Sequence, residues 1–402
     1  MQSNTASRGK YLIIGVAAML IMGTIYTWSY FKTVLASLYP VWNQKQLSLT
    51  FTIMMICFAL GGLLGGKLTK SLGHGKTAML SGILMLLGFE VAAFLPEVSE
   101  ALALPMLYVF YGGCTGLGCG IGYNAVLSGV NSWFPDRDGF ISGVLLFGFG
   151  LSSLLLANAA AALLKHMSLF TLFRILGLLS AVILLIAARI LRLPGEDDKL
   201  PAPAKKKSLP GARDYTTAEM IRRPTFWIYF LWNLCMSATG MLVINNASSI
   251  TVFFGAAATI GMTVSIFNSG GRLLVGALVD KCGWKATMFI NNGVIIAAGV
   301  LMVLGNSVDS FALVLIGMLL TGICYGGGVT IQASLVRTFY GNESYAMNFS
   351  TCNLVSIPAA IIGPMISAAL VDAAGGSFGP TFVMVVVMGC LSLVLNLFVR
   401  KP

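Results

Sequence analysis

Long apolar runs recur along the whole chain, and they require lipid as the solvent in which most of it folds. Only 10% of the 402 residues are charged, against about 25% in a typical soluble domain. A run of about 20 apolar residues crosses the ~30 Å hydrocarbon core of a bilayer. Such runs lie at roughly 11–31, 46–66, 77–96, 102–132, 139–164, 170–192, 224–247, 256–279, 286–306, 310–338, 345–371 and 378–399. The sequence predicts an all-α membrane protein with twelve transmembrane helices.

The basic residues are distributed by membrane side. Twenty of the 25 lysines and arginines fall on the side that carries both termini, whereas Lys32, Lys45, Lys165 and Arg174 fall on the other. Cytoplasmic loops carry the excess of such residues. We therefore expect both termini in the cytoplasm and the chain in a bacterial cytoplasmic membrane. Because the bases do not gather on one binding face, the net charge of +11 does not indicate nucleic acid.

One extended polar connection divides the runs into two sets of six. Residues 193–223 are rich in Pro, Lys and Asp, as a solvated linker is. The division predicts an N-terminal half at 1–192, a cytoplasmic linker at 193–223 and a C-terminal half at 224–402. At the end of the linker, DYTTAEMIRRPTFW looks helical, with a proline at the start of the seventh long helix.

A glycine-rich basic turn occurs once in each half, about 210 residues apart. GGKLTKSLGHGK ends the second run, and GALVDKCGWK, with Gly276, Gly283 and Lys285, ends the eighth. Correspondence between halves is typical of repeat-built transporters, whose substrate sites lie at the repeat interface near the bilayer midplane. The turns resemble the loop motif of the major facilitator superfamily. Asp280 matches the acidic residue of that motif, and Lys70 departs from it.

Arg272 is a charge inside an otherwise apolar run. Such a charge costs about 2.5–3.5 kcal/mol on insertion scales, so it is a functional-site hypothesis by default. Eight residues, or ~12 Å of helix, separate it from Asp280, and no acidic residue lies within one helical turn. A guanidinium binds a carboxylate through two parallel hydrogen bonds. We expect Arg272 to bind an anionic substrate; the alternative is that its side chain extends toward Asp280 in a structural role.

Several segments resemble the oxalate/formate antiporter family of the major facilitator superfamily. They are YTWSYF, YNAVLSGVNSWFPDRDGFISG, DYTTAEMIRRPTFW, NSGGR and NFSTCN. The resemblance implies the major facilitator fold, transport of small carboxylates and a carboxylate-binding Arg272. Asn268 stands four residues earlier, where some related monocarboxylate transporters have an aspartate.

The same resemblance bears on the charge of the substrate. Oxalate-transporting members pair the arginine with a lysine in helix eleven, and Ser356 occupies that position here. A second buried carboxylate would lack a partner. The sequence therefore favours a monocarboxylate over a dicarboxylate.

Aromatic and amide residues supply the remaining candidate substrate contacts. By analogy with the family, the cavity walls are expected from Tyr26, Trp28, Tyr30, Tyr123 and Tyr325. Tyr26 and Tyr30 are four residues apart and share a helical face, whereas Trp28 points elsewhere. Asn124, Asn353 and Ser356 are candidate donors to a carboxylate. The alternatives are an interfacial aromatic belt and amides that only bridge helices.

Helix eleven contains candidate gating residues. Pro358 and Pro364, with Gly363, interrupt its apolar run and predict a kink. Glu90 is the one acidic residue inside a predicted span. It either carries a proton or reaches the lipid headgroups.

The sequence shows no metal-ligand spacing, phosphate-binding loop or nucleophile motif, so we expect no cofactor, no metal and no enzyme activity. The expected function is secondary transport of lactate-, pyruvate- or formate-type monocarboxylates by alternating access. Symport with a proton, antiport with another anion and facilitated diffusion all fit the sequence. The protein is expected to be a monomer in the lipid bilayer. The open alternatives are a dicarboxylate exchanger, a facilitator-type exporter of another small solute, and a membrane receptor or sensor.

Overall fold

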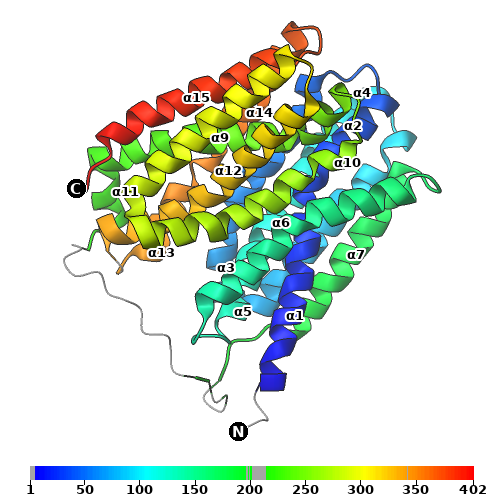
Figure 1. Ribbon diagram of the computed structural model, residues 1–402. Helices are drawn as coiled ribbons and strands as arrows, with labels where there is room; N and C mark the ends of the chain where they lie inside the picture. Colours follow the sequence, from blue (N-terminus) through cyan, green and yellow to red (C-terminus); the bar gives the residue numbers. More distant parts are fainter. Residues whose placement is uncertain (1–4, 196–197, 199, 202–213, 342) are drawn as a thin grey trace. The chain divides into compact units, whose positions relative to one another are not determined.

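The computed structural model describes residues 5–195, 198, 200–201, 214–341 and 343–402, and this part of the chain is almost entirely helical (Figure 1). Its contacts divide it into two compact units. The first unit contains Met1–Trp28 and Leu49–Lys206, and the second contains Ser29–Ser48 and Lys207–Pro402. The division into 1–192, 193–223 and 224–402 stays a prediction, since residues 196–197, 199 and 202–213 of the expected linker lie outside the described residues.

Up to residue 190 the described residues form seven α-helices, two short 3-10 helices and one π-helix. One of the 3-10 helices and the π-helix lie inside longer helical stretches. In order they are α1 (Thr5–Met22), η1 (Gly23–Thr27, 3-10), α2 (Trp28–Leu38), α3 (Gln44–Ala93), η2 (Leu95–Glu97, 3-10), α4 (Glu100–Met106), η3 (Leu107–Thr115, π), α5 (Gly116–Asn131), α6 (Asp138–Leu163) and α7 (Leu169–Ile190).

After the linker the described helices are all α-helices. In order they are α8 (Thr217–Ile221), α9 (Pro224–Phe253), α10 (Ala258–Gly261), α11 (Thr263–Ser307), α12 (Phe311–Tyr340), α13 (Tyr345–Asn353), α14 (Ser356–Ala373) and α15 (Gly379–Phe398). No strand occurs among the described residues.

Ten helical stretches of the described residues are long and apolar enough to cross a membrane, and two of these are 50 residues long. In α3 and α11 the helix breaks at Gly73 (φ 81°) and Gly283 (φ 78°). Both angles lie in a region that side chains with a Cβ rarely adopt. Each of these two stretches therefore comprises two membrane-length segments, and the predicted count of twelve is confirmed. The expected basic turns are these two breaks, and helix continues on both sides of each.

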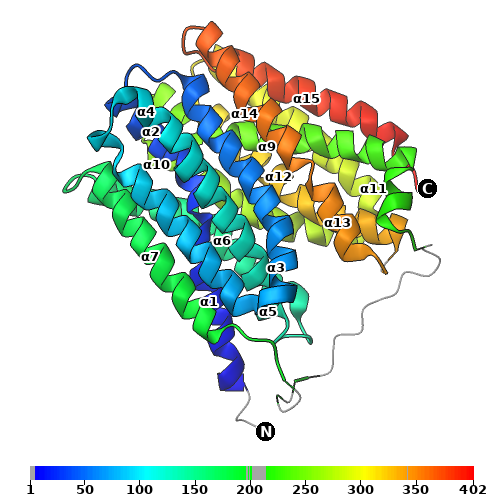
Figure 2. The same cartoon turned by 180° about the vertical axis from the view of Figure 1, so that it is seen from behind.

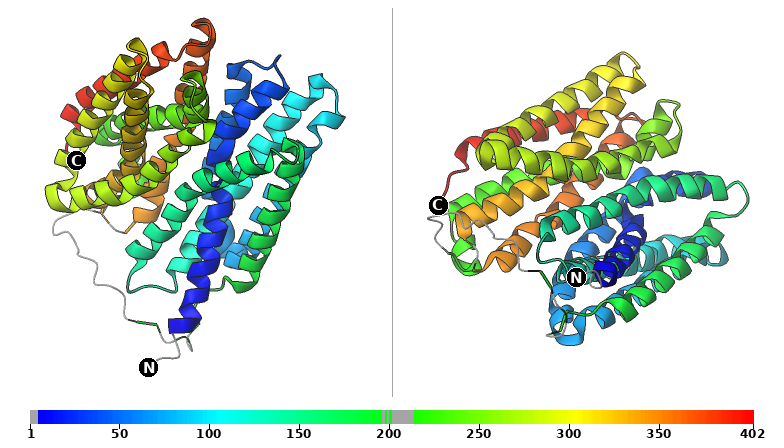
Figure 3. Two further views of the ribbon diagram at one scale, coloured as in Figure 1. Left: turned by 45° about the vertical axis from the view of Figure 1, so that its right-hand side comes forward. Right: turned by 60° about the horizontal axis from the view of Figure 1, so that its bottom comes forward.

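Neighbouring helices within each unit pack along their lengths. In the second unit α11 lies beside α12 (Figures 1 and 2). In the first unit α1 packs against α6 and α7 (Figure 3).

The predicted start of the seventh long helix is confirmed. Thr216 and Glu219 form a reciprocal capping box at the start of α8, which satisfies two backbone N–H groups. Pro224 then begins α9, at a position where its missing N–H costs nothing.

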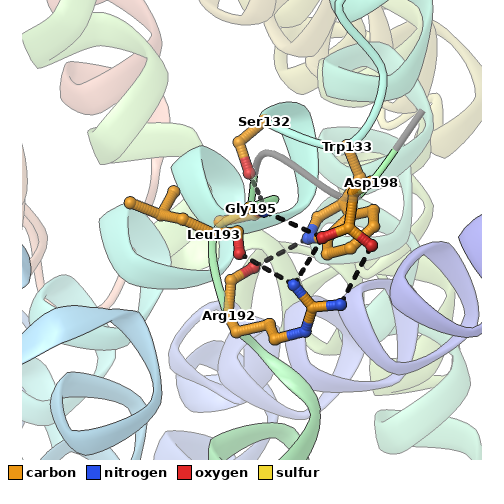
Figure 4. Close-up of polar contacts among 7 residues, drawn as sticks. Ser132, Trp133, Arg192, Leu193, Gly195 and Asp198 are labelled. Atoms are coloured by element: carbon orange, nitrogen blue, oxygen red, sulfur yellow. Dashed lines mark hydrogen bonds and ion pairs between the residues drawn. The ribbon is translucent and has the colours of Figure 1, made fainter. Parts of the chain in front are cut away.

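The run NSWFPDRDGFISG of the first unit joins the N-terminal helix to the start of the linker. The Trp133 ring stacks on Tyr11 at 4.0 Å, and its indole N–H donates to the Arg192 carbonyl oxygen at 2.7 Å. The Arg192 guanidinium lies 4.8 Å from the centre of the Trp133 ring and donates to both carboxylate oxygens of Asp198, at 2.6 and 3.0 Å (Figure 4). These hydrogen bonds and one from the Gly195 N–H lower the pKa of Asp198.

The N-terminus joins the same cluster through a second arginine. Arg8 donates through Nε to the Trp133 carbonyl oxygen at 2.7 Å and pairs with the carboxylate of Asp136. Desolvation raises the pKa of Asp136, but hydrogen bonds from Arg8, from its own backbone and from Arg137 outweigh it and leave that pKa lowered. The motif that supports the family resemblance therefore has a structural role on this side of the first unit.

One expectation about a helix end is wrong. The first transmembrane helix was expected to end near residue 31, but its final part, α2, runs to Leu38. Lys32, which the sequence assigns to the outer side of the membrane, has a fully buried side chain, and its side of the membrane stays a prediction.

The kink of helix eleven lies earlier than expected, at Leu354–Val355 between α13 and α14. Pro364 is inside α14, which continues through it to Ala373. The physical reason for the break is Pro358: it has no N–H to donate to the carbonyl four residues earlier, and its ring excludes that carbonyl.

Candidate functional site

One face of α11 is polar and turned into the protein. At 100° per residue, Asn268, Ser269 and Arg272 fall within a 100° sector. Asn268 and Ser269 are each 2% exposed, whereas Leu273 and Leu274 on the other side are 59% and 58% exposed. A surface helix of a soluble protein has a polar outer side and an apolar inner side, whereas this helix has an apolar side toward lipid and a polar side toward the protein.

The polar face carries hydrogen-bond donors that no described residue satisfies. The unpaired buried atoms are Nδ2 of Asn268, Oγ of Ser269, and Nε and Nη1 of Arg272. No ion pair within the described part of the chain includes Arg272, and Asp280, its alternative partner, is exposed. A buried polar group without a partner costs several kcal/mol in an apolar medium. The cluster can therefore bind a ligand that brings acceptor oxygens.

Close backbone contact with α12 fixes this stretch of α11. A Cβ on Gly326 would overlap the carbonyl oxygen of Asn268, and one on Gly271 would overlap that of Ile323. The Thr330 hydroxyl donates to the Arg272 carbonyl oxygen at 3.1 Å. Because these contacts hold the backbone, the position of the arginine does not depend on its own side-chain contacts.

The first unit contains an aromatic cluster that includes two predicted residues. Tyr26 contacts Phe149 edge-on at 5.5 Å, and Tyr123 contacts both Phe149, at 5.3 Å, and Phe58, at 5.5 Å. Phe58 and Phe149 were not foreseen, because an apolar ring inside an apolar run gives no sequence signal. The structure thus brings Tyr26 and Tyr123 together through two phenylalanines.

The other two aromatics of helix one make different contacts. The Trp28 ring lies 5.3 Å from Tyr111, and Tyr30 lies 6.2 Å from Phe31. The expectation that Tyr26 and Tyr30 share a helical face assumed α-helix over this stretch, but 23–27 is a 3-10 helix. Its three residues per turn change the relation between residues four apart.

The remaining predicted donors are engaged with other groups. The Asn124 amide donates to the Gly62 carbonyl oxygen at 2.6 Å, and the Ser356 hydroxyl donates to the Asn353 carbonyl oxygen at 2.8 Å. Asn353 also accepts a hydrogen bond through Oδ1, at 2.7 Å, from Gln332.

Gln332 belongs to a buried network that the sequence did not point to. Its Oε1 accepts from Asn233 at 2.8 Å, and Asn233 accepts from Ser237 at 3.3 Å. The network links α9, α12 and the break of helix eleven. Tyr325 of the same unit packs on Gly240 of α9, where a Cβ would overlap its ring.

The candidate residues of the two basic turns, for which a gating or structural role is predicted, lie near the breaks of the two long helices. Lys70 and Asp280 are exposed, each three residues before the positive-φ glycine of its turn. Gly276 of α11 faces the methyl group of Thr330. Glu90 pairs with Arg174 at 3.3 Å, so the acidic residue inside a predicted span has a basic partner.

Lys32 is a buried residue that sequence reasoning did not single out. Its ammonium donates to Asn246 Oδ1 at 2.8 Å and, at 3.5 Å, to Ser48 Oγ. The available signal was the apolar TVLASL that follows it, which continues the helix for almost two turns beyond the charge.

Comparison with known proteins gives a consistent picture. A family model of the Major Facilitator Superfamily matches residues 11–357. The chain is 29% identical to the uncharacterized MFS-type transporter YhjX of Escherichia coli, over 87% of this chain and 84% of that protein. It is 27% identical to the oxalate:formate antiporter of Oxalobacter formigenes, over 98% and 91%.

Solved structures share the fold at low sequence identity. A partially occluded inward open conformation of the xylose transporter XylE from Escherichia coli superposes with a TM-score of 0.69 at 13% identity, over 97% of this chain and 98% of that one. At this identity the likeness concerns the fold alone.

Proposed function

The chain belongs to the Major Facilitator Superfamily, so it is a multi-pass membrane transporter, and we propose that it moves small organic anions, with monocarboxylates of the lactate, pyruvate and formate type as substrates. The proposed mechanism is alternating access, in which Arg272 binds the substrate carboxylate on one side of the membrane and releases it on the other. No catalytic step is part of this proposal.

The unpaired guanidinium of Arg272 carries the proposal. Its Nε and Nη1 are buried and make no hydrogen bond with the described residues, so the guanidinium has donors to offer to the oxygens of a carboxylate. A cation exporter would instead present buried acidic groups to its substrate. The donors of Asn268 and Ser269 lie on the same face and offer further hydrogen bonds to the anion.

Relatives support the substrate class. The oxalate:formate antiporter is 27% identical across nearly the whole chain. Apicoplast pyruvate carrier 1 of Toxoplasma gondii is 26% identical over 71% of this chain and 62% of that protein. Both names describe transport of small carboxylates, which is the chemistry that an unpaired arginine suits.

The number of available cations favours a monocarboxylate. Helix eleven contains no lysine, and Ser356 stands in the place of one. Lys32 is a second buried cation, but Asn246 and Ser48 already accept its hydrogen bonds. Arg272 is therefore the buried cation with unpaired donors in the described part of the chain, and one such cation balances one carboxylate.

A dicarboxylate exchanger is the second candidate, and Lys32 is the observation that favours it. An ammonium that exchanged Asn246 for a substrate oxygen would provide the second positive charge that oxalate needs. This candidate predicts oxalate uptake that depends on both Arg272 and Lys32.

We further propose that residues 1–192 and 224–402 are the two halves that move during transport and that 193–223 connects them. Both termini would lie in the cytoplasm of a bacterial cell, as the distribution of basic residues favours. The proposed transport unit is a monomer, with or without a coupled proton.

Uptake into proteoliposomes tests the substrate and the arginine together. Labelled lactate, pyruvate, formate and oxalate are offered to the wild type and to the Arg272→Ala, Arg272→Lys and Ser356→Lys variants, with and without a pH gradient. We expect monocarboxylate uptake to fall at least a hundredfold in Arg272→Ala. Arg272→Lys should recover only a small part of it, because an ammonium lacks the planar pair of donors. We expect oxalate uptake only after Ser356→Lys.

Two results would contradict the proposal. If correctly inserted Arg272→Ala transports normally, the arginine has a structural role. If the wild type exchanges oxalate and Lys32→Met abolishes that exchange, the dicarboxylate candidate replaces the monocarboxylate one. Acceleration by an inside-alkaline gradient would add proton coupling.

A further inference from the structure

The segment Ser29–Ser48 packs with a different unit from its neighbours in sequence. Met1–Trp28 before it and Leu49 onward after it belong to the first unit, whereas the segment itself belongs to the second. It contains α2 and the first residues of α3. A segment that leaves one unit to pack on the other needs specific contacts there.

A buried lysine makes the central contacts of this segment. Lys32 donates to Asn246 Oδ1 of α9 at 2.8 Å, and its ammonium lies 3.5 Å from Ser48 Oγ. Asn245, the neighbour of Asn246, donates to the same Ser48 hydroxyl at 3.0 Å. Lys32, Ser48 and Asn245 are all 0% exposed, so these hydrogen bonds form away from water.

Two further hydrogen bonds lie on either side of this centre. The backbone N–H of Ser248 donates to the Ser29 hydroxyl at 2.8 Å. At the other end, the backbone N–H of Lys45 donates to Asp372 Oδ2 at 3.3 Å. The segment is thus joined to α9 by its beginning, its lysine and its last residue, and to the end of α14 by Lys45.

The lysine is buried without a hydrogen-bonded counter-charge. Its two acceptors are a neutral amide and a neutral hydroxyl, and Asp372 acts on it only through space. Removing an ammonium from water is unfavourable, and neutral acceptors only partly offset that cost. The contact is therefore weaker than a buried ion pair, and a modest change in free energy can open it.

We propose that Ser29–Ser48 is a latch, held closed on α9 and α14 as in this structure and released once in each transport cycle. Lys32 sets the strength of the latch, since its burial opposes closure while its hydrogen bond to Asn246 favours it. The proposal rests on the proposed function, because alternating access is what requires the segment to separate from the second unit.

A reversible covalent lock tests whether the latch has to open. The Ser29 hydroxyl lies 2.8 Å from the Ser248 nitrogen, which places the two Cα atoms within the ~7 Å that a disulfide spans. We expect oxidation of the S29C/S248C variant to lower uptake at least tenfold, and a reductant to restore it. The S29C and S248C single variants are the matched controls and should not respond to oxidation.

A charge cycle at Asn246 tests the role of Lys32 without any transport assay. The readout is the labelling rate of the S29C variant, purified in detergent, by a maleimide, located by mass spectrometry, with exposed Cys282 as an internal reference. N246D supplies a counter-charge, so it should slow labelling at residue 29 several-fold. In a K32M background the same N246D buries a carboxylate without a partner, so labelling should become faster. If N246D slows labelling when Lys32 is present and speeds it when Lys32 is absent, the two residues interact.

Three results would overturn the latch. They are full transport by the oxidised S29C/S248C variant, failure of that pair to cross-link, and equal effects of N246D with and without Lys32. The maleimide readout needs no substrate. If no carboxylate is transported but labelling follows the charge cycle, the proposed function fails and the latch remains.

Discussion

The helix pairs α3–α5 and α11–α12 share one backbone arrangement and differ in what it presents. In both pairs a glycine approaches a carbonyl oxygen too closely for a Cβ: Gly120 meets Phe58, and Gly326 meets Asn268. Phe58 and Asn268 are 210 residues apart in the sequence, as are the two positive-φ glycines. The backbone contacts therefore belong to the repeated fold.

The side chains at matched positions show where the chemistry lies. Where α11 carries Asn268 and Arg272, α3 carries Phe58 and Gly62. Even the hydrogen bond that steadies the backbone is repeated, because Asn124 donates to the Gly62 carbonyl oxygen and Thr330 to that of Arg272. The difference teaches that the repeat supplies the scaffold in both halves, whereas at these matched positions only α11 carries buried donors without a partner among the described residues.

The largest expected effect comes from disrupting the close approach of a glycine to a carbonyl oxygen that both helix pairs share. Gly120→Ala and Gly326→Ala should each cost about 3 kcal/mol, because the added methyl group overlaps a backbone carbonyl that cannot move without shifting its helix. Thermal unfolding in detergent and the yield of monodisperse protein measure the loss. Gly66→Ala is the control, since no atom lies near its Cβ position. A large loss in only one of the two variants would show that the helix pairs are not equivalent.

The second-largest effect concerns the affinity for substrate, and it compares Asn268 of α11 with Phe58 at the matched position of α3. Asn268→Leu removes a donor that faces the anion, so the KM for the transported carboxylate should rise about tenfold, as the loss of one hydrogen bond to a charged group predicts. Phe58→Leu should raise it by no more than about threefold, the value of an aromatic contact. Concentration-dependent uptake measures both, and equal shifts would remove the functional distinction between the halves.

A smaller effect tests the two turns. Gly73→Ala and Gly283→Ala should each lower stability by about 1 kcal/mol, because alanine is strained at φ near +80°. The local hydrogen bonds also match: Thr77 donates to the Gly73 carbonyl oxygen at 2.7 Å, and Thr287 to that of Gly283 at 2.8 Å. Midpoints of thermal unfolding should therefore fall equally, and a silent substitution at either site would contradict the equivalence.

The smallest effect concerns the hydrogen bonds that steady α3 and α11. Asn124→Ala and Thr330→Val should each cost about 0.7 kcal/mol of stability. Only Thr330→Val should also weaken uptake, by about twofold, because it releases the backbone that carries Arg272. Paired unfolding and uptake measurements check this, and loss of uptake in Asn124→Ala alone would assign that amide to the substrate.

Much of this architecture could be predicted from hydropathy. The twelve segments, the two glycine turns and the start of α9 at Pro224 follow from apolar length, turn composition and proline position. The depth of Arg272 in its run marked it as a candidate, because an isolated cation in an apolar helix has few structural uses.

The remaining features depend on contacts between segments that are far apart in the sequence, and the order of residues along the chain does not reveal such contacts. The burial of Lys32 could not be predicted, because Asn246 and Ser48, which accept its hydrogen bonds, are remote from it in sequence. Phe58 and Phe149 are indistinguishable in sequence from lipid-facing rings. The break before Pro358 falls where the proline removes a hydrogen bond, four residues before the ring itself.

The unpaired guanidinium of Arg272 also has an electrical consequence. Arginine stays protonated at every physiological pH, so a carrier loaded with one carboxylate holds one positive charge less than the empty carrier. A membrane potential acts on that difference, with up to about 2.3 kcal/mol per charge per 100 mV. Exchange of one monocarboxylate for another never returns the empty carrier and is insensitive to voltage. Net uptake without a coupled proton does return it, so voltage dependence distinguishes exchange from uncoupled uptake.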